Sequence, residues 1–286
     1  MPDAKFTLPD DVTAYRWEPA GAPVGVVQLT HGMGEHVLRY ERVARAFADR
    51  GFVAYGQDHR GHGASAGAVP GDLGPGGWPA LVADIGVLTA RAREEQPGLP
   101  VVLLAHSMGS FAAQQYLLDH SADVDAVILT GTAALDVLEP ALDLDQPLDL
   151  AVFNAPFQPQ RTDYDWLSRD ESEVDAYVAD PLCGFGIDPA NTKAMFAGAR
   201  RLADPAEVAR MRSDLPVYLA VGDQDAVNAN LALFDVLVRR YRDAGLKDLT
   251  VRVYPEARHE ILNETNRAEV VADMLAWVEK AVDRAG

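Results

Sequence analysis

Residues 101–109 read Val-Val-Leu-Leu-Ala-His-Ser-Met-Gly, an apolar run that ends in a serine between small residues. A helical pattern follows directly, from Ser107 to His120. Ser107 therefore lies on a predicted strand-to-helix turn, where the two backbones approach closely and small residues are needed two positions before and two after it. Gly109 meets this need, and Ala105 stands where glycine is usual. The stretch is typical of a nucleophile elbow, and its main alternative is a helix-capping serine.

The alternation of strand and helix continues on both sides of this stretch. Apolar, mostly non-alternating runs of buried-strand length occur at Val24–Thr30, Phe52–Gln57, Pro100–Ala105, Val124–Thr130, Pro216–Gly222 and Leu249–Tyr254. Helical patterns lie at Leu38–Arg50, Trp78–Glu95, Ser107–His120, Ala229–Ala244 and Arg267–Val282. This order predicts an α/β fold with a mostly parallel central sheet flanked by helices.

The alternation stops between residues 133 and 212, which are rich in Asp and Pro. Several short helical candidates lie there, but no convincing buried strand does. A structureless loop of that length is uncommon in a compact domain, so we predict an inserted lid. Residues 1–132 and 213–286 then form the two parts of one core.

A serine hydroxyl needs a base to take its proton, and the base needs a carboxylate to orient it. In this fold the chain order is serine, then Asp or Glu, then His. Asp223 and Asp225 follow one predicted strand and His259 follows the last, so all lie at the strand ends where such folds gather active sites. Asp225 is preferred because it lies farther from the strand end, and Asp223 remains the alternative.

Negative charge that develops on an attacked carbonyl oxygen needs backbone N–H donors already in place. One is expected from Met108, directly after the serine. The second is expected from Met33, in the glycine-rich loop at residues 31–36. Such a loop is weak evidence alone, and its value lies in its place beside the elbow.

Composition excludes several classes of protein. The net charge of −18 disfavours binding to nucleic acid and to anionic lipid surfaces. Cys183 is the single cysteine, so no intrachain disulfide forms, and no Cys/His spacing of a structural zinc site is present. We expect Cys183 to be a buried structural thiol.

The N-terminus lacks signal-peptide features and no apolar run reaches membrane-helix length, so a cytoplasmic location is expected. His59, His62 and His120 are expected to shape turns or to lie at the surface.

Four segments carry a resemblance to a known family. They are HGMGEH with Arg39-Tyr40 at 31–40, DHRGHGAS at 58–65, HSMG at 106–109, and the GDQD and ARHE pair near the C-terminus. The chain thus resembles the monoacylglycerol lipase and lysophospholipase branch of the α/β-hydrolases, which is grouped with serine aminopeptidase-like hydrolases. The segment from Trp166 to Leu182 resembles the lid of that family.

The resemblance implies the α/β-hydrolase fold, with a helical lid inserted after the sixth strand. It implies Ser107 as nucleophile, Asp225 as orienting acid, His259 as base, and the N–H groups of Met33 and Met108 as oxyanion hole. It also implies that no cofactor or metal is needed, because ester hydrolysis requires only water and these groups.

The expected function is a serine carboxylic-ester hydrolase that acts through an acyl-enzyme on monoacylglycerols, lysophospholipids or other medium-chain esters. Membrane contact is expected to be transient at most, through the lid. The alternatives are an amidase or aminopeptidase, with Asp143, Asp145 or Glu171 as anchor for an amino terminus, and a non-catalytic binding protein. The apolar residues of the lid either line an acyl pocket or pack the lid onto the core, so no substrate-binding residue is assigned. They are Leu142, Leu144, Leu148, Leu150, Val152, Phe153 and Phe157.

Overall fold

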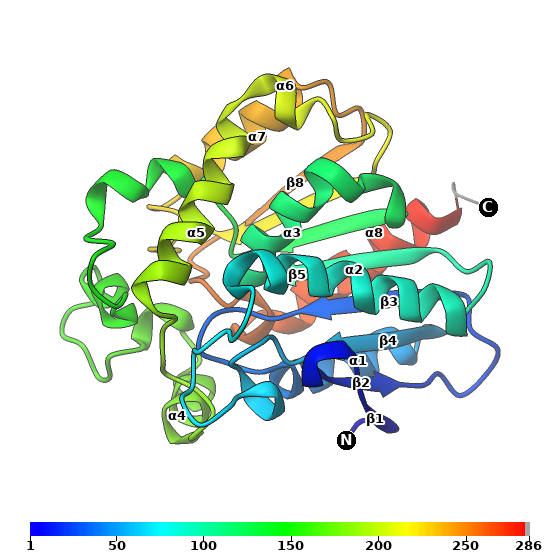
Figure 1. Ribbon diagram of the computed structural model, residues 1–286, viewed down its shortest axis with the longest axis horizontal. Coiled ribbons are helices and arrows are strands. Elements are labelled where there is room, and N and C mark those ends of the chain that lie inside the picture. The colour runs from blue at the N-terminus through cyan, green and yellow to red at the C-terminus, as the bar shows by residue number, and fades with distance from the viewer. Residues whose placement is uncertain (284–286) are drawn as a thin grey trace.

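An eight-stranded sheet runs through the molecule (Figure 1), whose computed structural model describes residues 1–283. The strands are β1 (Ala4–Thr7), β2 (Thr13–Trp17), β3 (Gly25–Thr30), β4 (Phe52–Gln57), β5 (Val101–His106), β6 (Ala126–Thr130), β7 (Val217–Gly222) and β8 (Leu249–Tyr254). Their order in the sheet is β1-β2-β4-β3-β5-β6-β7-β8. The pairs β1–β2 and β2–β4 are antiparallel, and every later pair is parallel. The predicted α/β class and mostly parallel sheet are confirmed.

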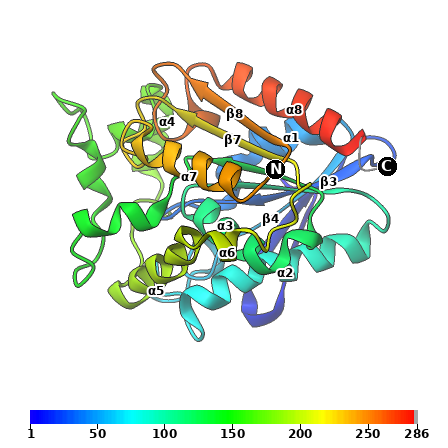
Figure 2. The same ribbon diagram turned by 90° about the horizontal axis from the view of Figure 1, so that it is seen from above.

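Helices cover both faces of the sheet, as the view from above shows (Figure 2). One face carries α1 (Glu41–Ala48) and α8 (Arg267–Asp283), and the other carries α2 (Gly77–Glu95), α3 (Met108–His120) and α7 (Ala232–Asp243). Strands β3 to β7 are buried along their whole length, which explains their continuous apolar sequences. Among residues 1–283, none of the helices combines the length and apolar character that a membrane crossing requires.

Two N-terminal strands and two helix starts differ from the prediction. β1 and β2 were not predicted. The helix predicted from Leu38 begins with a 3₁₀ turn, η2 (Val37–Tyr40), and α1 starts only at Glu41. The helix predicted from Ala229 starts at Ala232, because residues 229–231 have positive φ values of 50–78°. The other 3₁₀ turns of the core are η1 (Pro9–Asp11), η3 (Gly63–Ser65), η4 (Ser121–Asp123) and η10 (Ile261–Asn263).

Residues 133–212, called the insertion below, follow the sixth strand and are all described by the structure. They contain no strand. Their elements are η5 (Leu135–Val137), η6 (Glu139–Ala141), η7 (Leu150–Asn154), η8 (Asp165–Leu167), α4 (Glu171–Ala179), α5 (Pro189–Arg200), η9 (Arg201–Ala203) and α6 (Pro205–Val208). Figure 1 shows the insertion up to α5 in green to yellow-green on the side of the molecule away from the C-terminus, and α6 at the top beside α7 (Ala232–Asp243).

The Asp-rich and Pro-rich composition of the insertion has a local cause. Four aspartates accept a backbone N–H at the first turn of η7, α4, α5 and α6, and they are Asp149, Asp170, Asp188 and Asp204. Asp is a favoured N-cap residue because its oxygen satisfies a free N–H of the first turn. Proline is tolerated at the next position, where no N–H is needed. Much of the acidic character therefore starts helices rather than binding a ligand.

Candidate active site

Ser107 lies at the sharp turn between β5 and α3. Its backbone has φ 50° and ψ −122°, a left-handed value that a residue with a side chain adopts only under constraint. The turn passes so close to β3 that a Cβ atom on Gly109 would lie 2.4 Å from the His31 carbonyl oxygen. Glycine is therefore required at 109. Ala105 is fully buried in β5, and its methyl group packs in the core.

His259 links Ser107 to Asp225. His259 Nε2 lies 2.8 Å from Ser107 Oγ, and Nδ1 lies 2.9 and 3.0 Å from the two carboxylate oxygens of Asp225. Asp225 follows β7 and His259 follows β8, so the ends of neighbouring parallel strands bring the three side chains together. Both Asp225 and His259 are buried. Their arrangement is the hydrogen-bond chain that activates a serine nucleophile in unrelated hydrolases.

Asp223, the alternative carboxylate, has another position. Its Oδ1 accepts the Glu256 N–H at 2.7 Å and the Gln224 side chain at 3.2 Å. It ties the loop after β7 to the loop that precedes His259. Of the two carboxylates that the sequence analysis left open, the structure brings Asp225 to the histidine.

The charge of Asp225 shapes the basicity of the histidine. Burial by itself would lower the pKa of His259, but the charge of Asp225 and its hydrogen bond outweigh burial, so the pKa lies above the ordinary value of 6.5. The ring of His106 is 4.9 Å from that of His259. Burial and the neighbouring His259 lower the pKa of His106 to about 3. His259 therefore takes up a proton in preference to His106.

The His31–His36 loop follows β3 and faces Ser107. A Cβ atom on Gly32 would lie 3.1 Å from Ser107 Cβ, and Met33 and Met108 line the same pocket as Ser107. Within residues 1–283, neither the Met33 N–H nor the Met108 N–H is paired with a protein acceptor. Both predicted donors therefore lie beside the serine with their N–H groups unpaired.

A buried ion-pair network joins this loop to the histidine segment. Glu35 accepts the Gly32 N–H at 2.6 Å and the Tyr40 hydroxyl at 2.8 Å. Arg39 donates to Glu35 at 2.6 Å and to both carboxylate oxygens of Glu260 at 2.6 and 2.8 Å. The sequence analysis assigned these residues no role. Arg39 and Glu260 are 221 positions apart, so no local pattern reveals the pair.

Two groups of side chains bring metal-binding atoms within 4.8 Å of one another among the described residues. The first is Glu35, His106 and Glu260, all buried. Arg39 already pairs with both of its carboxylates, so the negative charge there is neutralised. The second is His36, Asp180 and Cys183, where the His31–His36 loop meets the insertion.

An apolar pocket begins at Ser107. The insertion contributes most of its wall, and the core adds Phe111 and Val227. The apolar insertion residues in the wall are Leu135, Leu138, Leu142, Leu148, Leu150, Phe153, Trp166, Met195 and Phe196. The pocket has a free volume of about 40 Å³, which is room for a few water molecules. An acyl chain needs more space than this arrangement gives.

The apolar residues that the sequence analysis singled out in the insertion divide into three groups. Leu142, Leu148, Leu150 and Phe153 line the pocket. Leu144 and Phe157 pack against the core. Val152 points outward, with 50% of its surface exposed. The four residues that line the pocket also pack against the core, so the two alternatives for this set do not exclude each other.

A second part of the insertion, residues 164–185, contacts both loops of the site and is called the clamp segment below. The carbonyl groups of Trp166 and Leu167 accept the backbone N–H groups of His259 and Glu260 at 3.4 and 2.7 Å. The Trp166 ring also packs on His259 at 5.1 Å. On the other side, the Gly34 carbonyl accepts the Tyr177 hydroxyl and the Gly184 N–H at 2.8 and 2.9 Å.

His59 and His62 lie on a turn, as expected, in which the His62 N–H donates to the His59 carbonyl at 2.9 Å, but both are fully buried rather than at the surface. Their rings lie 4.3 and 5.3 Å from that of His31. Burial lowers the pKa of His59 to about 3 and that of His62 to about 4. They are neutral packing groups beneath the His31–His36 loop. His120 is exposed, as expected.

Comparisons with known proteins agree with this geometry. The family described as "Serine aminopeptidase, S33" matches residues 21–266. A monoacylglycerol lipase from Mycolicibacterium smegmatis is 33% identical over 270 residues, which cover 92% of this chain and 90% of that protein. The human monoglyceride lipase is 29% identical, over 94% of this chain and 87% of its own length. A thermostable carboxyl esterase from Bacillus coagulans has a TM-score of 0.85 at 27% identity, over 98% of both chains.

Proposed function

Because the chain belongs to the serine aminopeptidase S33 family of α/β-hydrolases, in its monoacylglycerol-lipase-like branch of carboxylic-ester hydrolases, we propose that it cleaves esters through an acyl-enzyme on Ser107. The observation that carries the proposal is the hydrogen-bond chain from Ser107 through His259 to Asp225.

In the first half of the proposed reaction, Ser107 Oγ attacks the ester carbonyl carbon while His259 Nε2 takes the hydroxyl proton. Asp225 stabilises the resulting imidazolium without taking its proton. The oxygen that becomes negative accepts hydrogen bonds from the N–H groups of Met33 and Met108. His259 then gives its proton to the leaving alcohol, and the acyl group stays on Ser107.

In the second half, water enters in place of the alcohol. His259 removes a proton from this water as it attacks the acyl-enzyme, and the same two N–H groups stabilise the oxyanion again. Collapse of the intermediate returns the proton to Ser107 and releases the carboxylic acid. Each step uses groups of the chain and water, and no metal or cofactor takes part.

The proposed substrates are monoacylglycerols, lysophospholipids or other medium-chain esters. The apolar wall that begins at Ser107 supports this class, since an acyl chain gains free energy by leaving water there, at about 0.8 kcal/mol per methylene. The positions of the acidic residues considered as anchors for an aminopeptidase substrate also favour an ester substrate. Asp143, Asp145 and Glu171 are exposed, and none of them lines the pocket.

We further propose that the insertion, residues 133–212, acts as the lid. The pocket is too narrow for an acyl chain in this arrangement. Residues 135–157, called the pocket segment below, supply its outer wall, and exposed ion pairs such as Lys193 with Asp145 and Arg200 with Glu139 connect them to α5. Such pairs contribute little free energy, so the main cost of moving this segment outward is the exposure of its buried apolar side chains, such as Leu135 and Leu150.

The testing experiment measures hydrolysis of p-nitrophenyl esters from acetate to palmitate, with 1-monoacylglycerols alongside, for the wild type and Ser107→Ala. We expect a maximum at a medium or long acyl chain and a loss of roughly 10⁶-fold in the variant. Fluorophosphonate labelling of the wild type and not of Ser107→Ala identifies the nucleophile. A maximum at acetate or butyrate would indicate a small-ester esterase, and labelling that persists in the variant would refute the assignment of Ser107.

A further inference from the structure

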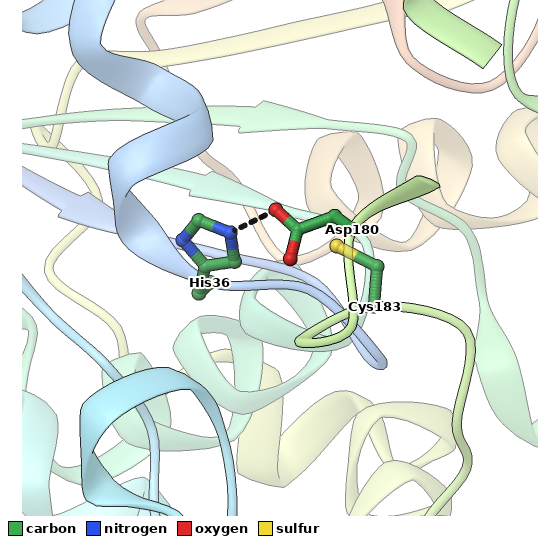
Figure 3. A group of neighbouring side chains, drawn as sticks. All are labelled: His36, Asp180 and Cys183. Atoms are coloured by element: carbon green, nitrogen blue, oxygen red, sulfur yellow. Dashed lines mark hydrogen bonds and ion pairs between the residues drawn. The ribbon is translucent and has the colours of Figure 1, made fainter. Parts of the chain in front are cut away.

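Three side chains with different metal-binding atoms meet where the insertion touches the His31–His36 loop (Figure 3). His36 ends that loop, and Asp180 and Cys183 follow α4. His36 Nε2 lies 2.9 Å from Asp180 Oδ2, although 144 positions separate the two residues. Donor atoms of all three side chains lie within 4.8 Å of one another. No spacing in the sequence shows such a group.

These donors suit Zn²⁺. Zinc binds imidazole nitrogen and carboxylate oxygen at about 2.0–2.2 Å and thiolate sulfur at about 2.3 Å, in tetrahedral sites. Mg²⁺ and Ca²⁺ prefer oxygen ligands alone. Around a tetrahedral ion with those bond lengths, ligand atoms lie roughly 3.3–3.6 Å apart. The pair of His36 and Asp180, 2.9 Å apart, must open by a few tenths of an ångström. No other pair must close by more than about 1 Å, which small side-chain rotations allow.

The ligands themselves supply the negative charge at this place. The Asp180 carboxylate pairs with His36, whereas the nearby carboxylates of Glu35 and Glu260 are already paired with Arg39. Zinc binds the thiolate form of cysteine, so binding of the ion releases the thiol proton. Two anionic ligands then balance the charge of the ion.

The three side chains are accessible and partly held in place. The side chains of His36 and Asp180 are 10% and 29% exposed, and Cys183 is half-buried rather than fully buried as predicted. The Asp180 carboxylate accepts the Leu182 N–H at 2.8 Å, and its carbonyl accepts the Cys183 N–H at 3.1 Å. Two ligands therefore share one turn, which lowers the entropy that binding must offset.

We propose that His36, Asp180 and Cys183 form a Zn²⁺ site that fastens the insertion to the His31–His36 loop. The ion replaces one hydrogen bond with three coordinate bonds, His36 carries its proton on Nδ1, and the thiol proton goes to solvent. Water fills the fourth position. Because only the folded chain brings the ligands together, zinc raises the free energy of unfolding. The proposal concerns binding and stability, and it does not depend on the hydrolytic activity.

The test uses the full chain, stripped with a chelator that is then removed. Thermal unfolding is followed as Zn²⁺ is added, and we expect Tm to rise by about 5 °C when the ion is at roughly 100 times its Kd. Mg²⁺ should leave Tm unchanged. Co²⁺, as a spectroscopic substitute, should produce the charge-transfer absorption of a cobalt–thiolate bond in the wild type.

Variants assign the ligands. Loss of an outer-shell partner weakens metal affinity roughly 10–100-fold, so loss of a ligand should do at least as much. Cys183→Ser should lose the cobalt–thiolate band and bind Zn²⁺ at least tenfold more weakly, while Asp180→Asn should keep the band and bind more weakly. The control is His120→Ala, because His120 and Asp123 form a surface pair at 3.3 Å without a thiol. This variant should bind like the wild type.

The proposal is overturned if the wild type shows no cobalt–thiolate band, or if Zn²⁺ leaves its Tm unchanged. Both readings use the wild type, so they decide the question even where a variant fails to fold. Equal Zn²⁺ affinity of the wild type and Cys183→Ser, or a tenfold loss in His120→Ala, would also overturn it by placing the ion elsewhere.

Discussion

The carboxyl ends of the sheet strands, called the sheet edge below, and the pocket segment place side chains near Ser107 by different means. At the sheet edge, Ser107, Asp225 and His259 follow the parallel strands β5, β7 and β8, with β6 between β5 and β7, and the backbone ladder of the sheet sets their separation. The pocket segment holds Leu148 and Phe153 on 3₁₀ turns and loops, with no ladder behind them. A rigid sheet suits groups whose spacing must hold within fractions of an ångström, whereas an acyl chain needs only apolar surface of roughly the right shape.

The clamp segment belongs to the insertion by sequence and to the site by its contacts. Its backbone carbonyl groups hold the N–H groups of His259 and Glu260, and Tyr177 holds Gly34. We therefore expect substitutions in the clamp segment to affect turnover, and those in the pocket segment to affect the choice of acyl chain.

The largest effect is expected at the carboxylate of the sheet edge. Asp225→Asn should reduce kcat by about 10⁴-fold, because the histidine loses the charge that stabilises its protonated form and holds its tautomer. Asp223→Asn is the matched control, since Asp223 is bonded to Glu256 and Gln224 instead. Steady-state kinetics on the preferred ester compares the two. A mild Asp225→Asn beside a damaging Asp223→Asn would reverse the assignment.

A smaller effect is expected in the pocket segment. Leu148→Trp should reduce kcat/KM for long-chain esters roughly 10–100-fold and leave acetate turnover close to that of the wild type, because the indole fills the pocket. Val152→Trp is the control, since Val152 lies in the same segment with half of its surface exposed. The measurement is the ratio of octanoate to acetate kcat/KM. A ratio that changes equally in both variants would place the acyl chain elsewhere.

A weaker effect is expected in the clamp segment. Tyr177→Phe removes the hydroxyl that donates to Gly34 at 2.8 Å, and a hydrogen bond of this kind contributes about 0.5–1.5 kcal/mol. We expect kcat to fall roughly 3–10-fold with KM and chain-length preference unchanged. The control is Tyr164→Phe, whose hydroxyl donates to Gly184 at 3.1 Å and not to the loop. A changed chain-length preference in Tyr177→Phe would assign the clamp segment to the pocket instead.

The smallest effect concerns pH. The free enzyme needs a neutral His259, so kcat/KM should rise with pH through a midpoint above 6.5, since Asp225 and Glu260 raise the pKa of His259. Glu260→Gln removes the weaker of these two charges and should lower the midpoint by a fraction of a unit. The pH profile of kcat/KM measures both. A wild-type midpoint at or below 6.5 would contradict the proposed balance between Asp225 and burial.

The core was predictable from sequence because its strands are buried on both faces and read as continuous apolar runs. β1 escaped notice because it is a four-residue edge strand that alternates half-buried Ala4 and Phe6 with exposed Lys5 and Thr7. β2, which lies between β1 and β4, has only five residues and includes Thr13 and Arg16, so it does not read as a continuous apolar run. The 3₁₀ turns of the insertion have no periodicity that a pattern can show. Only η7 among them begins with a capping aspartate, Asp149.

The candidate site was predictable where chemistry follows strand order and unpredictable where it depends on contacts across the fold. Ser107 and His259 follow recognisable strands, and so does Asp225, although its choice over Asp223 required coordinates. Nothing local in the sequence pairs Arg39 with Glu260. The sequence also does not show that the acidic insertion supplies the apolar wall of the pocket, because leucines and aspartates alternate along residues 142–150.

The two hydrogen bonds that the Gly34 carbonyl accepts from the insertion also limit how such a gene can recombine with those of its relatives. A crossover that replaces all of residues 133–212 exchanges Tyr177 and Gly184 while keeping the loop that they hold. A crossover that replaces only residues 135–157 leaves those bonds intact. New substrate ranges can therefore be acquired by exchange of the shorter block, while exchange of the longer block requires matching changes in residues 31–36.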